Sequence, residues 1–75
     1  MEFHEILRLR RLQLRWTQQE LADASGVHVR QVARYELGEQ EPRLSTAAAL
    51  ADALGLTLDQ LTGLTPGWDT AKEPE

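Results

Sequence analysis

The sequence predicts an all-α domain built from five short helices. Gly26, Gly38 and Gly55 each follow a run of residues with helical spacing, and glycine tolerates the left-handed conformation that a helix end needs. The segments Thr17–Glu20 and Thr57–Gln60 are capping boxes, which mark helix starts because the two side chains cap each other's backbone amides. The 75 residues include no cysteine, so helix packing or a partner subunit must stabilise one modest core.

The first helix is expected over residues 3–14, which contain no proline or glycine and consist mostly of good helix formers. Apolar residues at helical spacing predict its inward side, which carries Phe3, Ile6, Leu7 and Leu14. Leu9 and Leu12 point elsewhere and have no obvious cover.

The second helix follows its cap Thr17 and runs to about Ser25, with Trp16 packed on Leu21 as a hydrophobic staple. The third helix is expected over residues 29–37. Its inward positions are Val32, Tyr35 and Glu36. Its other face carries Arg30, Ala33, Arg34 and Leu37, with Val29 and Gln31 near the leading end.

The fourth helix is expected roughly over residues 44–54, and a fifth helix of one or two turns opens at the second capping box. The inward positions of these two helices are Leu44, Leu50, Ala51, Leu54, Leu58 and Leu61. Beyond Thr62 the composition shifts to glycine, threonine, proline and charge, so we expect the domain to span residues 1–65 and a tail to span 66–75, anchored by Trp68.

Charge is distributed unevenly along the chain. The net charge is −4, which taken alone argues against a nucleic-acid partner. Residues 6–34, however, carry a net charge of +4, whereas residues 35–75 carry −6. Any surface that binds an anion is therefore predicted to lie in the first half of the chain.

Two short helices on either side of Gly26 predict a helix-turn-helix, a motif that places its second helix in the major groove of DNA. Over about residues 3–63 the sequence resembles the Cro-type, lambda-repressor-like helix-turn-helix family. The matching positions are Leu7, Arg11, residues 17–22, Gly26, Val27, Val32, residues 34–36, Gly38, Pro42, Leu50, Ala51, Leu54, Gly55 and residues 58–61. The resemblance implies a five-helix DNA-binding domain that binds double-stranded DNA as a two-fold homodimer.

The resemblance also implies roles for individual positions. The positions that face the bases are Val29, Arg30, Ala33 and Arg34. Those placed for phosphate contact are Gln18, Gln19, Gln31 and Arg43. Arg11 and Glu36 match a pair that forms a structural salt bridge between the first and third helices.

The residue types suit these roles chemically. Arginine can donate twice to O6 and N7 of guanine, and the methyl groups of Val29 and Ala33 suit the methyl group of thymine. Arg30 and Arg34 are one helical turn apart, so both can enter one groove. We therefore predict a half-site with at least one guanine.

Three features depart from the family pattern. His28 stands where serine or threonine is common, so it is predicted to cap poorly. It is then either a plain surface histidine or, alternatively, a residue that faces the DNA backbone, where its protonation would tighten binding. Arg15 stands where glycine is common, so either it is strained in a left-handed conformation or the turn differs. Glu39 and Glu41 lie in the loop near the phosphates, which predicts weak binding by a monomer and a shallow salt dependence.

The dimer surface has two interpretations. Family resemblance favours the fifth helix and its flanking residues, with Leu56, Leu58, Leu61, Leu64 and Trp68. Alternatively, the dimer surface comprises Leu9, Leu12, Leu37, Leu64 and Trp68. A third arrangement has the tail folded over the first helix, so that it hides Leu9 and Leu12 within one chain.

No enzyme site, metal site or cofactor is predicted, since the histidines are isolated and no glycine-rich phosphate loop is present. The acidic start and the lack of a long apolar stretch predict a cytoplasmic, nucleoid-associated protein with no membrane partner. We predict a sequence-specific transcriptional regulator that acts as a repressor. The alternatives are an antitoxin-like autoregulator that also binds a toxin or other protein, and a helix-turn-helix used only as a protein-interaction module.

Overall fold

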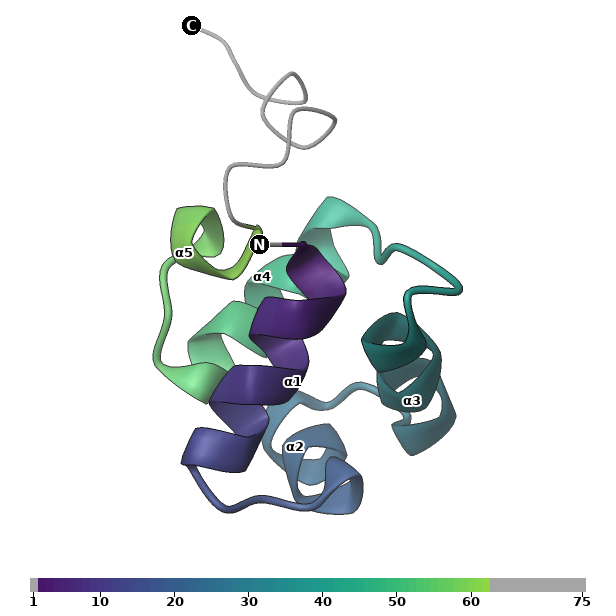
Figure 1. Cartoon of the computed structure of the whole chain (residues 1–75), viewed down its shortest axis with the longest axis vertical. Coiled ribbons are helices and arrows are strands. Elements are labelled where there is room, and N and C mark those ends of the chain that lie inside the picture. The colour runs from purple at the N-terminus through teal and green to yellow at the C-terminus, as the bar shows by residue number, and fades with distance from the viewer. Residues whose placement is uncertain (1, 63–75) are drawn as a thin grey trace, which may run out of the picture.

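The computed structural model describes residues 2–62, which form a bundle of helices around one core (Figure 1). Within this part of the chain the helices are α1 (Phe3–Gln13), α2 (Gln18–Ser25), α3 (Val29–Leu37), α4 (Leu44–Leu54) and α5 (Leu58–Thr62). The predicted all-α class and the five helices are confirmed. Their bounds differ from the predicted ones only at α1, which ends one residue earlier than expected.

The helix ends follow the local chemistry that the sequence indicates. The backbone amide of Glu20 donates to Thr17 Oγ1 at 3.0 Å, and the amide of Thr17 donates to Glu20 Oε1 at 2.8 Å. The same reciprocal capping joins Thr57 and Gln60 at the start of α5. Gly26 ends α2 with a φ of 77°, a conformation in which a side chain would be strained. The turn between α2 and α3 is thus determined by a cap at one end of α2 and a glycine at the other.

The core is built from one apolar face of every helix. Its largest completely buried side chains are Leu7, Leu21, Val32, Leu50, Leu54 and Leu61. Trp16 and Leu14 are partly buried and pack against this cluster. Burial of the inward positions predicted for α3, which are Val32, Tyr35 and Glu36, is confirmed.

The predicted inward stripe of α4 is wrong at its first residue. Leu44 is 44% exposed, whereas Ala47 is completely buried. Leu50 faces the core, and at about 100° per residue Leu44 lies about 120° around the helix from it, while Ala47 lies about 60° away. Leu44 is also the first residue of the helix, where no neighbouring helix covers it.

The helices pack so that α3 contributes to the core from one side only. α2 contacts α3 and α4, and α1 contacts α3 and α5. Arg10 Nε donates to the carbonyl of Leu54 at 3.0 Å and so joins α1 to the C-terminal end of α4. The side of α3 that faces away from these contacts is directed to solvent, and it is the side that carries Arg30 and Arg34.

Arg15 adopts the left-handed conformation, with a φ of 61°. It is the one residue other than glycine with positive φ in the part of the chain that the structure describes. The first of the two predictions for this turn is therefore confirmed.

The predicted tail, residues 66–75, lies outside the described residues, as do Leu64 and Trp68. Among residues 2–62, no helix has the length and apolar character needed to cross a membrane.

Candidate nucleic-acid interface

The outer side of α3 is defined by the amphipathic pattern of the helix. Val32, Tyr35 and Glu36 are buried. The residues predicted to read bases lie on the remaining surface, where Arg30 and Arg34 are exposed and Val29 and Ala33 are partly exposed. We call these four residues the reading face of α3. The structure thus brings together on one surface the four positions that the resemblance assigned to the bases.

The guanidinium groups of Arg30 and Arg34 are not used within the domain. In residues 2–62 neither group takes part in a hydrogen bond or an ion pair. Each guanidinium therefore keeps its full set of N–H donors for a ligand. Their positions one helical turn apart place both groups on the same stretch of surface.

His28 holds the start of the reading face. Its Nδ1 accepts a hydrogen bond from the backbone amide of Arg30 at 3.1 Å, so the side chain is the N-cap of α3. This contact requires an unprotonated Nδ1, which places the proton of a neutral ring on Nε2. The histidine therefore performs the capping role that serine or threonine would have at this position.

A buried ion pair attaches α3 to α1. Arg11 Nε donates to Glu36 Oε2 at 2.6 Å, and Arg11 Nη2 donates to Glu36 Oε1 at 3.0 Å. Arg11 and Glu36 are 9% and 7% exposed. The third donor, Arg11 Nη1, reaches the carbonyl of Trp16 at 2.6 Å. These contacts fix the orientation of α3 relative to α1 and to the turn before α2.

Gln18 extends this network to the start of α2. Its Nε2 donates to Glu36 Oε1 at 3.1 Å, so one carboxylate receives hydrogen bonds from α1 and from α2. The sequence pointed to Gln18 only as a phosphate contact, and no local spacing signals a partner eighteen positions away. Gln19 is engaged more locally, since its Nε2 donates to Asp23 Oδ1 at 2.9 Å.

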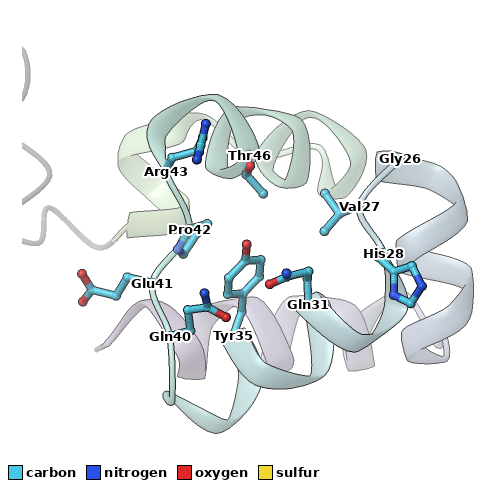
Figure 2. Close-up of a pocket in the computed structure, with 10 residues that line it drawn as sticks. All are labelled: Gly26, Val27, His28, Gln31, Tyr35, Gln40, Glu41, Pro42, Arg43 and Thr46. Carbon is cyan, nitrogen blue, oxygen red and sulfur yellow. The ribbon is translucent and has the colours of Figure 1, made fainter.

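Gln31 and Arg43 line one hollow beside α3, together with Tyr35, Thr46, Glu41 and others (Figure 2). The hollow has a volume of about 650 Å³, and the hydroxyl group of Tyr35 points into it. The Oε1 atom of Gln31 is buried without a hydrogen-bond partner in the described part of the chain. Sequence reasoning gave no sign of this unsatisfied acceptor.

A second hollow, of about 490 Å³, lies on the other side of the start of α3. Gln19 and Val29 line it, and it shares Gly26, Val27 and His28 with the first hollow. The predicted phosphate residues therefore do not form one cluster. Gln19 lines the second hollow, Gln31 and Arg43 line the first, and Gln18 lines neither.

The surface around these hollows is not uniformly basic. Arg30, Arg34 and Arg43 are exposed, but Glu39 and Glu41 are exposed in the loop between α3 and α4. In residues 2–62, no three histidine, cysteine, aspartate or glutamate side chains are grouped so as to hold a metal ion. The chemistry that this surface offers is donation of hydrogen bonds to an anionic or polar ligand.

The residues predicted for the dimer surface differ in how far they are exposed to solvent. Leu61 is completely buried in the core of its own chain. Leu56 and Leu58 are partly exposed beside it. Leu64 and Trp68 lie outside the described residues. Of the residues predicted for this surface, only Leu56 and Leu58 are both described and partly exposed.

Comparison with known proteins agrees with this geometry. A model of the family described as helix-turn-helix matches residues 7–61. The chain is also similar to the cryptic phage CTXphi transcriptional repressor RstR of Vibrio cholerae serotype O1, at 32% identity over 75 residues. The alignment covers 100% of this chain and 64% of that relative, so the chain spans less than two thirds of its length.

Proposed function

The chain belongs to the helix-turn-helix family, and on this premise we propose that it is a sequence-specific DNA-binding transcriptional repressor that acts as a homodimer. One observation carries the proposal. The reading face of α3 presents two exposed guanidinium groups that form no hydrogen bond or ion pair within residues 2–62. The similarity to a phage transcriptional repressor supports the same function.

In this proposal α3 enters the major groove. Arg30 and Arg34 each donate two hydrogen bonds to O6 and N7 of a guanine, while Val29 and Ala33 contact thymine methyl groups. The His28 cap and the pair of Arg11 and Glu36 hold the helix in this orientation before DNA arrives. Pre-ordering of the helix reduces the conformational entropy that binding must otherwise cost.

The two hollows beside the start of α3 would receive the two DNA backbones that border the groove. Gln31 must meet phosphate through its Nε2 group, because its Oε1 atom is an acceptor, as phosphate oxygens are. Gln18 has one N–H group on Glu36 and a second N–H group left for phosphate. Gln19 and Arg43 complete the set, and Arg43 stands at the start of α4, where a helix favours anions.

A homodimer would present two copies of α3 to major grooves about 34 Å apart. Leu56 and Leu58 are the described residues that we propose for its interface. The exposed Glu39 and Glu41 weaken the attraction of one subunit for DNA, so doubling the contacts by dimerisation is needed for stable binding. Repression then follows from occupancy of a promoter.

The test is selection of bound sequences from random double-stranded DNA at low salt, followed by the mass of the complex. We expect an enriched site with two inverted half-sites, each containing guanine, and a mass of two chains per duplex. No enrichment by a folded, dimeric protein would contradict the proposal and would favour a helix-turn-helix used for protein contacts alone. A second protein that co-purifies in fixed ratio, together with DNA binding, would favour the antitoxin-like regulator.

A further inference from the structure

α1 carries two half-exposed leucines on the side that faces away from the core. Leu9 and Leu12 are 43% and 45% exposed, although Leu7 of the same helix is completely buried. Residues three apart are neighbours on a helix surface, so Leu9 and Leu12 form one apolar patch. Arg8 lies beside the patch and Arg15 follows at the end of the helix, and both are exposed. We call these four residues the outer face of α1.

A second copy of the chain does not fit this patch. A stable interface between two proteins buries about 800 Å² on each partner, which two half-exposed leucines cannot supply. A segment tethered to the same chain needs far less contact area, because its effective concentration is in the millimolar range and it loses less translational freedom on binding. The small size of the patch therefore favours an intramolecular occupant.

Residues 63–75 have the chemistry that matches the outer face of α1. Their two large apolar side chains, Leu64 and Trp68, come first along the chain. Beyond Trp68 there are three acidic residues and one lysine. On the outer face the leucines lie between Arg8 and Arg15, so that Arg15 follows the leucines along the chain as the carboxylates follow Trp68. Apolar groups thus meet apolar groups, and carboxylates meet guanidinium groups.

The segment also starts in the right place and is long enough. α5 packs against α1 and ends beside the start of α1 (Figure 1). The rise from Phe3 to Leu12 along α1 is about 14 Å. The six residues from Thr62 to Trp68 can span up to about 20 Å. Trp68 can therefore reach Leu9 and Leu12, and the residues after it can reach Arg15.

The position of Glu5 on α1 agrees with a segment that runs from the start of α1 toward its end. Glu5 lies one turn before Leu9 and would repel carboxylates placed near it. The acidic residues of the segment come last, at the end furthest from Glu5.

From these observations we infer that residues 64–75 bind the outer face of α1 in the same chain. Trp68 packs between Leu9 and Leu12, and Asp69, Glu73 and Glu75 lie toward Arg15. This contact assigns Trp68 to its own chain and leaves the dimer surface to Leu56 and Leu58. It involves no residue of α3, so the reading face stays available to DNA.

The direct test is nuclear Overhauser spectroscopy on the 75-residue chain. We expect cross-peaks between the indole protons of Trp68 and the methyl groups of Leu9 and Leu12. The fluorescence of Trp68 is obtained by subtracting the spectrum of the same protein with Trp68→Phe. In the double variant Leu9→Ser, Leu12→Ser, acrylamide should quench this Trp68 fluorescence more strongly than in the wild type. Both substitutions are at the surface, and circular dichroism checks that the helices remain.

Leu37→Ser provides the matched control, because Leu37 is 69% exposed but lies on α3. It should leave the quenching of Trp68 unchanged. Absence of the cross-peaks, or equal quenching in the wild type and the double variant, would overturn the inference. A sample that mixes isotope-labelled and unlabelled chains distinguishes the remaining arrangement. Cross-peaks found only between differently labelled chains would show that the segment binds a second copy, and would also overturn it.

Discussion

Arg11 and the two arginines of the reading face, Arg30 and Arg34, carry the same guanidinium group in opposite surroundings. Arg11 is 9% exposed and donates to both carboxylate oxygens of Glu36 and to the carbonyl of Trp16. Arg30 and Arg34 are exposed and have no partner within residues 2–62. An arginine whose three side-chain nitrogens all donate hydrogen bonds inside the fold is part of the scaffold, whereas one whose donors are unused can bind a ligand.

The largest expected effect comes from breaking the buried pair. Arg11→Ala leaves the Glu36 carboxylate buried with Gln18 as its remaining donor. Removal of one partner of a buried ion pair costs about 3–5 kcal/mol, and we expect a loss of this size in the free energy of unfolding. Urea denaturation followed by circular dichroism measures it.

The double variant Arg11→Met, Glu36→Leu separates the cost of a stranded charge from the loss of the pair itself. Because no charge is left buried, it should recover most of the stability lost by Arg11→Ala. If Arg11→Ala unfolds at the same urea concentration as the wild type, the pair does not hold α3 in place.

The next largest effect concerns the unused guanidinium groups. Arg30→Ala and Arg34→Ala should each weaken binding to the selected DNA site by about 1–3 kcal/mol and relax the preference at one base pair. The stability of the free protein should change by less than about 0.5 kcal/mol, since these side chains are exposed and their guanidinium groups form no hydrogen bond or ion pair within residues 2–62. Titration of labelled DNA measures the affinity.

Arg8→Ala is the matched control, because Arg8 is an exposed arginine on α1 rather than on α3. It should leave the base preference unchanged. An unchanged preference in both α3 variants would remove the distinction between scaffold and reading arginines.

The sequence alone predicted the helix ends and the buried and exposed sides of α3 well, because both depend on local chemistry. Thr17, Gly26 and the 3.6-residue period of α3 act within a few residues, so their effects can be read along the chain. The hydrogen bond from Gln18 to Glu36 could not be predicted in this way. It depends on how α1, α2 and α3 are placed relative to one another, which only tertiary packing determines.

Two other features were missed for different reasons. Leu44 was expected to be buried because it is apolar, although its position about 120° around α4 from Leu50 already directs it away from the core. The unsatisfied Oε1 atom of Gln31 depends on the shape of the hollow beside α3. Composition and spacing contain no information on that shape.

Arg15 represents a third kind of arginine, and its substitution is expected to change the free energy of unfolding by less than the breaking of the buried pair does. Arg15 neither belongs to the buried pair nor lies on the reading face, and its left-handed backbone, at a φ of 61°, is unfavourable for a residue with a Cβ atom. Arg15→Gly should therefore raise the free energy of unfolding by about 1 kcal/mol. Arg8→Gly makes the same chemical change inside α1 and should lower it by about 0.5–1 kcal/mol. Thermal melts of both variants measure the two changes, and a loss of stability in Arg15→Gly would contradict the strain.

The smallest expected effect concerns the carboxylates that oppose the reading arginines. Glu41 lines the same hollow as Arg43, and Glu39 precedes it in the loop. The variant Glu39→Gln, Glu41→Gln removes repulsion between this loop and phosphate, so DNA binding at low salt should tighten by less than about 1 kcal/mol.

The gain should shrink as salt is added, since exposed charges are screened over about 10 Å at 0.1 M ionic strength. Asp52→Asn changes an exposed acidic position on α4 that lines neither hollow. It removes one negative charge where the loop variant removes two, so the two gains are compared per charge removed, and the gain for Asp52→Asn should be less than half of the gain for the loop variant. A gain for the loop variant of only twice the gain for Asp52→Asn would mean that net charge, not the position of the loop beside the reading face, limits affinity. Binding isotherms at several salt concentrations distinguish the two explanations, because only a local contact makes the loop variant respond more strongly per charge than its control.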